Sequence, residues 1–153
     1  MEGYNFSTDI LVRFAETDAQ GIAHHAAFVV WLEVARVAYL SEHAGGYLAI
    51  QKQGIEALTT AVEVRYHRAA FFDDRLRVWT RCVDIRGARF RYEYAVERPL
   101  TTGTAELVAE GSTEHATVDS ATRRPTRVPA SLAGAVARAE SPAPAQRPAH
   151  RPE

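Results

Sequence analysis

One acidic side chain stands just before the most apolar helical segment of the chain. Residues 13–36 read RFAETDAQGIAHHAAFVVWLEVAR, and this stretch places Asp18 in a short loop that also contains Gly21. His24 and His25 follow where the apolar segment begins. Backbone amides at the start of a helix can stabilise a negatively charged oxygen, while a nearby carboxylate acts as base or nucleophile. This order of residue types therefore indicates a site that could attack a carbonyl group.

Each of these residues also has an ordinary structural explanation. Asp and Gly are common in turns, and Asp or His can simply cap a helix. Taken alone, the stretch favours a capping role for Asp18 over catalysis. A metal site built on Asp18, His24 and His25 is not expected, because adjacent side chains on a helix point about 100° apart and seldom share an ion.

The composition is that of one ordinary domain. The chain has 153 residues, 46% of them apolar, and its 18 basic and 19 acidic side chains nearly balance. This balance gives no reason to expect binding to nucleic acid or to a membrane surface. No signal peptide is recognised and no apolar run reaches membrane-spanning length, so we expect a cytoplasmic protein. Cys82, in a strand-like run, is expected to be a buried side chain rather than a catalytic thiol.

The apolar pattern predicts one long helix early in the chain. A first strand is expected over residues 8–14. Apolar side chains then recur at helical spacing from His25 to His43, and Gly45-Gly46 ends the helix. A second, short helix is indicated over residues 47–53. Because the long helix is apolar around most of its circumference, other structure must surround it.

From Leu58 onward the apolar period changes from helical spacing to two. Further strands are predicted over residues 58–67, 75–85, 89–97 and 104–119. Short connections at Phe72–Asp74, Arg86-Gly87 and Pro99–Gly103 imply antiparallel neighbours. One helix followed by such strands predicts an α+β fold with the helix lying on one sheet.

The core pattern ends at Pro129. Residues 131–139 (SLAGAVARA) predict a weak terminal helix, and the segment from Glu140 onward is rich in Pro and Ala. We expect one domain over residues 1–129, and a weak helix with a disordered tail over residues 130–153.

Three sequence blocks occur together and in order. The first has the pattern T-D-x-x-G-h-x-x-H-x-x-[YF] followed by E-x-x-R, and its residues are Thr17, Asp18, Gly21, Ile22, His25, Phe28, Glu33 and Arg36. The second, V-x-Y-x-[KR]-P-A-x-x-x-D-x-L-x-V, is present as Val64, Tyr66, Arg68, Ala70, Asp74, Leu76 and Val78, with Ala69 in place of Pro. The third, E-G-x-x-x-H, is present as Glu110, Gly111 and His115.

With the strand layout, these blocks resemble the hotdog-fold acyl-CoA thioesterases, in the branch of hydroxybenzoyl-CoA thioesterase and the Tol-Pal-associated acyl-CoA thioesterases. The resemblance covers roughly residues 8–129. It implies a hotdog fold, in which a curved antiparallel sheet wraps a long central helix. It also implies that Asp18 is the catalytic carboxylate, acting either on water or directly on the thioester. The backbone amide of His25 is then expected to face the thioester oxygen, and no metal or redox cofactor is needed.

The resemblance further implies binding of an acyl-CoA substrate. Gly21, His24, Phe28 and Tyr66 are expected to bind the substrate. Gly21 would let the Asp18 loop approach it closely, and Phe28 and Tyr66 would line an apolar pocket. The phosphates of CoA require cationic side chains, for which the candidates include Arg68, Arg89 and Arg91. Taken alone, Phe28 and Tyr66 are more often plain core residues, an ordinary turn explains Gly21 about equally well, and a solvated strand face explains each arginine at least as well. Family assembly implies a homodimer or homotetramer with the active site at the dimer interface.

The predicted function is hydrolysis of acyl-CoA to a free acid and CoA. One alternative is a thioesterase acting on acyl or polyketide chains bound to an acyl carrier protein. Another is a non-catalytic acyl-CoA-binding hotdog module, which Asp18 disfavours because binding alone needs no carboxylate beside the thioester. A hotdog dehydratase is weaker still, since its expected His and Asp patterns are not recognised. The acyl group itself is not indicated.

Overall fold

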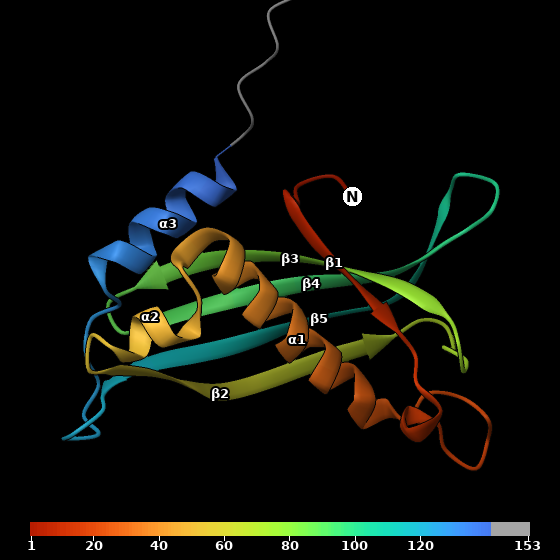
Figure 1. The fold of residues 1–153 in the computed structure, drawn as a ribbon, viewed down its shortest axis with the longest axis horizontal. Coiled ribbons are helices and arrows are strands. Elements are labelled where there is room, and N and C mark those ends of the chain that lie inside the picture. The colour runs from red at the N-terminus through yellow and green to blue at the C-terminus, as the bar shows by residue number, and fades with distance from the viewer. Residues whose placement is uncertain (142–153) are drawn as a thin grey trace, which may run out of the picture.

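The predicted α+β arrangement is present in the computed structural model, which describes residues 1–141 (Figure 1). One antiparallel sheet has the strand order β1-β3-β4-β5-β2. Its strands are β1 (Phe6–Leu11), β2 (Ile55–Tyr66), β3 (Arg75–Arg86), β4 (Arg89–Pro99) and β5 (Ala105–Asp119). The helices are α1 (His25–Ala44), α2 (Tyr47–Gln51) and α3 (Ala130–Glu140), with a 3-10 turn η1 (Phe14–Glu16) after β1.

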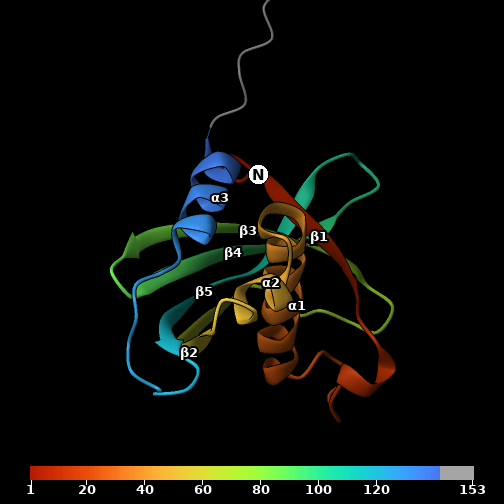
Figure 2. The ribbon, with the colours of Figure 1, turned by 60° about the vertical axis from the view of Figure 1, so that its left-hand side comes forward.

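The long helix α1 lies against one face of the sheet (Figures 1 and 2). Because β1 and β2 form opposite edges, the segment that joins them must cross a face, and α1 makes this crossing. Its sheet-facing side is almost fully buried and consists mainly of Phe28, Trp31, Leu32, Ala35 and Tyr39. Burying one large apolar side chain stabilises the fold by roughly 1.5–3 kcal/mol, so this side of the helix fixes its position.

The first strand was predicted over residues 8–14, but it begins and ends earlier, at Phe6–Leu11. After Val12 the chain leaves the sheet and forms the turn η1, in which Arg13 and Glu16 cap each other. Local hydrogen bonding therefore overrides the apolar pattern at Phe14, whose ring is exposed. This turn directly precedes the loop that contains Asp18 and connects that loop to β1.

The prediction that β2 and β3 are neighbours is wrong. β2 pairs with β5, and β3 pairs with β1 and β4. The segment His67–Asp74 is therefore a crossing connection, which passes the ends of β5 and β4 before β3 begins. The other two short connections do join antiparallel neighbours, as predicted.

The predicted two-residue alternation is clearest in β4. Phe90, Tyr92, Tyr94 and Val96 are buried beneath the helices, while Arg91 and Glu93 between them are less buried; the small side chain of Ala95 is buried as well. Cys82 on β3 is buried as predicted, and its burial raises the pKa of the thiol to about 12. Such a thiol stays protonated at neutral pH, which fits a packing role.

The last described helix, α3, is anchored to the rest of the fold. Leu132, Ala135 and Val136 are buried against neighbouring elements. At its end, Oε1 of Glu140 accepts hydrogen bonds from the hydroxyl of Tyr39 at 2.6 Å and from the backbone N–H of Cys82 at 3.0 Å. The tail was predicted to begin at Glu140, and its residues 142–153 lie outside the described part of the chain. Within residues 1–141, we find no helix that combines the length and apolarity needed to cross a membrane.

Candidate active site

A cavity of about 400 Å³ opens between the loop after β1, the first turn of α1 and the connection from β2 to β3. It brings together several of the predicted site residues, namely Asp18, His25, Phe28, Tyr66 and Arg68. The rest of its lining was not predicted to belong to the site and comprises Gln20, Ile22, Ala23, His67, Ala69 and Ala70. The motif blocks already contained a signal for part of this set, because Ile22 belongs to the first block and Ala69 and Ala70 belong to the second.

Asp18 is held by a tight turn. Its Oδ1 accepts a hydrogen bond from the backbone N–H of Gln20 at 2.8 Å, and its own N–H donates to the carbonyl of Ile22 at 2.9 Å. The turn closes with a bond of 3.0 Å from the N–H of Gly21 to the carbonyl of Asp18. Oδ2 has no hydrogen-bond partner among residues 1–141, so one carboxylate oxygen is fixed in the turn and the other is left without a bond there.

The start of α1 leaves one backbone amide uncommitted. The N–H of His24 donates to the carbonyl of Glu16, that of Ala26 to Nδ1 of His24, and that of Ala27 to the carbonyl of His24. Among the described residues, the N–H of His25 has no such partner. A helix N-terminus with a free N–H is a favourable place for a negative charge. His25 therefore offers the donor that an oxyanion site requires.

Gly21 and His24 adjoin the cavity without lining it. Gly21 has φ 77°, and a Cβ placed there would meet no atom within 4 Å, so the backbone conformation is what requires glycine. The ring of His24 packs on that of His25, with centroids 4.1 Å apart. His24 thus acts as the N-cap of α1 and supports His25 from outside.

Aromatic rings form the apolar wall. The ring of Tyr66 meets Phe28 edge-on at 5.1 Å, and Phe28 packs on Trp31 at 4.6 Å. The hydroxyl of Tyr66 donates a hydrogen bond of 3.0 Å to the carbonyl of His25. The wall and the first turn of α1 are therefore joined directly.

Glu16 ties the Asp18 loop to the helix. Its carboxylate accepts hydrogen bonds from Nε1 of Trp31 at 3.0 Å and from both the side chain and the backbone of Arg13 at 2.8 Å. Burial alone would raise the pKa of Glu16, but the bonds from Arg13 and Trp31 outweigh it and lower the pKa. Glu16 is therefore held as a carboxylate, which keeps these bonds strong.

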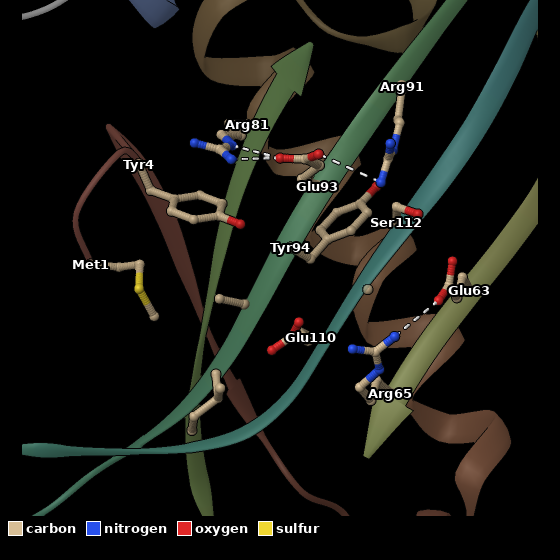
Figure 3. Close-up of a pocket in the computed structure, with 13 residues that line it drawn as sticks. Met1, Tyr4, Glu63, Arg65, Arg81, Arg91, Glu93, Tyr94, Glu110 and Ser112 are labelled. Carbon is tan, nitrogen blue, oxygen red and sulfur yellow. Dashed lines mark hydrogen bonds and ion pairs between the residues drawn. The ribbon is translucent and has the colours of Figure 1, made fainter. Parts of the chain in front are cut away.

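Arg89 and Arg91 lie outside this cavity. Both border a separate hollow of about 500 Å³ that also contains Thr60, Arg86 and Glu114. Arg91 additionally borders a groove of about 450 Å³ on the outer face of the sheet, where it lies 3.5 Å from Glu93 (Figure 3). Asp18 borders neither hollow, so one chain does not bring these arginines to the carboxylate.

Glu33 and Arg36, from the first motif block, form an ion pair of 3.6 Å on one side of α1. Arg36 is largely buried while Glu33 is exposed, which agrees with a structural role. Across residues 1–141, no group of three or more His, Cys, Asp or Glu side chains is placed to hold a metal ion.

Comparison with known proteins relates this geometry to a family. Residues 12–136 match the family described as the Thioesterase-like superfamily. The chain is 30% identical over 111 residues to a protein of Bacillus subtilis named "Putative acyl-CoA thioesterase YneP"; this match covers 72% of this chain and 78% of YneP. It is 29% identical over 82 residues to acyl-CoA thioester hydrolase YbgC of Escherichia coli O157:H7, which covers 54% of this chain and 61% of YbgC.

Solved structures confirm the hotdog fold. The DHNA-CoA thioesterase of Staphylococcus aureus superposes with a TM-score of 0.72 at 33% identity, covering 79% of this chain and 78% of that one. A 4-hydroxybenzoyl CoA thioesterase superposes with a TM-score of 0.77 at 19% identity, covering 86% and 97%, which supports the fold alone. Since the family match extends from the end of β1 into α3 and so includes the whole Asp18 cavity, the chain belongs to the Thioesterase-like superfamily.

Proposed function

We propose that this protein hydrolyses acyl-CoA to a free carboxylic acid and CoA in the Asp18 cavity. The names of its relatives YneP and YbgC support this reaction, as does the DHNA-CoA thioesterase among the similar structures. One observation about the chain itself carries the proposal. Asp18 and His25 line the same cavity at the start of a buried helix, and within residues 1–141 the backbone N–H of His25 has no hydrogen-bond partner.

The chemistry suits a thioester. Sulfur donates little resonance to the carbonyl, so the carbonyl carbon is easily attacked. When a nucleophile adds, the negative charge moves to the carbonyl oxygen, where the N–H of His25 and the dipole of α1 would stabilise it. The C–S bond then breaks, and the CoA thiolate leaves and takes up a proton. This sequence needs no serine or cysteine nucleophile.

Asp18 can act in either of two ways. As a general base it takes a proton from water, whose oxygen attacks the thioester directly. As a nucleophile it displaces CoA and forms a mixed anhydride, which water then hydrolyses. A single turnover in ¹⁸O-labelled water tests the nucleophilic route. Label in Asp18 demonstrates an anhydride whose aspartyl carbon is attacked by water, because the general-base route leaves Asp18 unlabelled.

The positions of Arg68 and Arg89 are compatible with a CoA-binding site that is shared between two copies of this chain. Arg68 is exposed at the cavity itself. Arg89 pairs with Ala116 across β4 and β5, and Ala116 pairs with Leu58 near the start of β2. If β2 pairs antiparallel with β2 of a second copy, the start of the second β2 lies beside Tyr66. Arg89 of the partner subunit would then lie about three strand spacings, or ~15 Å, from the edge of the cavity. The nucleotide and pantetheine arm of CoA can span such a gap.

The substitution Asp18→Asn tests the role of the carboxylate. Asn retains Oδ1, and with it the hydrogen bond from Gln20, but it loses the charge. We expect kcat to fall by about a hundredfold or more, measured as release of free CoA thiol. Asp9→Asn is the matched control, because Asp9 is an exposed carboxylate on β1, outside both the cavity and the connection His67–Asp74. Parental activity in a folded Asp18→Asn variant would overturn the mechanism.

The same assay addresses the alternatives. A panel of aryl and aliphatic acyl-CoAs identifies the acyl group, and matched acyl carrier protein substrates test the carrier alternative. Fast turnover of carrier-bound chains with slow turnover of acyl-CoA would favour that alternative. Binding of acyl-CoA without thiol release would favour a non-catalytic module. A homotetramer and a cytoplasmic location remain predictions.

A further inference from the structure

Arg98 lies outside the cavity yet holds one of its walls. It stands near the end of β4, with only 19% of its side chain exposed. Its guanidinium donates to Oδ2 of Asp74 through Nε at 3.2 Å and Nη2 at 2.7 Å. Nη2 also reaches the carbonyl of Ala69 at 2.6 Å, and Nη1 reaches Oε2 of Glu106 at 2.5 Å. Two of these acceptors belong to the crossing connection His67–Asp74.

The crossing connection needs such support because it does not continue a strand of the sheet. The backbone N–H groups of His67 and Arg68 both donate to the carbonyl of Val108 on β5, at 2.8 and 3.0 Å. Farther along, the N–H of Phe71 donates to Oδ2 of Asp74 at 2.8 Å. That oxygen is the one that Arg98 holds, so Arg98 fixes the end of the connection that faces β3.

The connection in turn fixes the Asp18 loop. The carbonyl of Ala70 accepts a hydrogen bond of 2.7 Å from the N–H of Ala23, immediately before the N-cap of α1. Ile22 and Phe71 form an isolated bridge. The carbonyl of Ile22 accepts from the N–H of Asp18 at 2.9 Å. A shift of the connection would therefore move both Asp18 and the start of α1.

From this chain of contacts, we propose that Arg98 is a positioning residue for thioester hydrolysis. It holds the connection His67–Asp74, which places Asp18 and the His25 amide at the spacing that attack requires. The proposal rests on the proposed role of Asp18. Displacement by about 1 Å can cost up to a hundredfold in rate. Lysine cannot replace Arg98 fully, because a single ammonium cannot bridge Asp74, Glu106 and the Ala69 carbonyl as a planar guanidinium does.

The test compares Arg98→Met and Arg98→Lys with Arg81→Met. Arg81 is a matched control because it also binds a carboxylate through two nitrogens, Glu93 at 2.9 and 2.6 Å, together with the carbonyl of Gly3 at 3.1 Å. It lies at the outer groove rather than at the Asp18 cavity (Figure 3). All variants are assayed well below their unfolding temperatures, with kcat and KM determined separately.

For Arg98→Met we expect kcat to fall by about tenfold or more while the protein stays folded, and Arg98→Lys should recover part of the loss. Arg81→Met should keep the parental kcat. In an Asp18→Asn background, Arg98→Met should have little further effect, because there is no carboxylate left to position. A merely structural role would not produce this non-additivity.

The possible failures are distinguishable. Parental kcat in folded Arg98→Met, beside an inactive Asp18→Asn variant, overturns the positioning role and leaves the proposed function intact. An equal loss of kcat in Arg81→Met also overturns it, because the effect is then general destabilisation. Parental activity in Asp18→Asn overturns instead the catalytic role on which the proposal rests.

Discussion

At the scale of single residues, Asp18 illustrates why a motif can have two explanations that are both correct. Its Oδ1 closes a turn with Gln20, as many aspartates do, while the residue also lines a cavity at the start of α1. The hydrogen bonds of this turn fix the orientation of the Asp18 carboxylate. The capping role and the proposed catalytic role are therefore parts of one arrangement.

His115, the last residue of the third motif block, belongs to the core rather than to the cavity. It is 1% exposed, stacks on Phe90 at 5.1 Å, and its Nε2 lies 2.7 Å from Oγ1 of Thr113. Burial, with a smaller effect of the Arg36 charge, lowers its pKa to about 4 from an ordinary value of 6.5. Folding therefore requires a neutral imidazole at this position.

This burial predicts loss of stability in weak acid. Between pH 6.5 and about 4, His115 binds a proton in the unfolded chain but not in the folded one. The free energy of unfolding should therefore fall as pH decreases through this window, by up to about 1.4 kcal/mol per pH unit from this residue. Urea unfolding of the parent and of His115→Gln at several pH values measures the difference. The same pH slope in both proteins would contradict the prediction.

At the scale of elements, α3 shows how a weakly predicted helix becomes part of the fold. Its apolar side is short, but Glu140 at its end satisfies two buried donors, the Tyr39 hydroxyl and the Cys82 N–H. Cys82 lies beyond the residues of β3 that pair with β1, so its N–H at that strand edge finds a side chain as its partner. Contacts between residues far apart in the sequence, rather than helix propensity, thus anchor α3.

The substitution Glu140→Ala should destabilise the protein without changing its chemistry. Leaving buried donors unpaired costs about 1–3 kcal/mol, which should appear as a lower free energy of unfolding in urea. Glu140→Gln keeps an acceptor oxygen and should recover part of this loss. Since Glu140 lies outside the Asp18 cavity, kcat measured on folded protein should match the parent. Unchanged stability in Glu140→Ala would show that the helix is held by other contacts.

At the scale of the whole molecule, the edge strand β2 is the feature that favours pairing with a second protein chain. It runs for 12 residues along one edge of the sheet (Figure 1), and Leu58 and Val62 on it are 38% and 43% exposed. Natural proteins protect long edge strands, because open edges pair with other chains. Pairing with a second copy would bury these side chains.

We therefore expect Val62→Lys to weaken a dimer formed through β2. Sedimentation velocity should show a shift toward monomer, and kcat/KM for acyl-CoA should fall with it if the partner subunit supplies Arg89. Leu100→Lys is the matched control, since Leu100 is 41% exposed but lies in the turn between β4 and β5. An unchanged sedimentation coefficient for Val62→Lys, or an equal shift for Leu100→Lys, would place the interface elsewhere.

The sequence by itself determined the kinds of elements and the motif residues. Helical and two-residue spacing are local properties, so α1 and the alternation in β4 could be predicted from the chain alone. The same holds for Asp18, His25 and Phe28, because one loop and the following helix carry them. Boundaries such as the end of β1 were missed where a local hydrogen bond, here between Arg13 and Glu16, competes with the apolar pattern.

Only the tertiary structure decided the strand order, the path of His67–Asp74, the contacts of Arg98 and the separation of Arg89 from Asp18. Each of these depends on contacts between residues far apart in the chain. Spacing along a sequence records the face on which a side chain lies, but it does not record which strand becomes its neighbour. The pairing of β2 with β5, and hence the crossing connection that walls the cavity, is set by the packing of the whole sheet on α1.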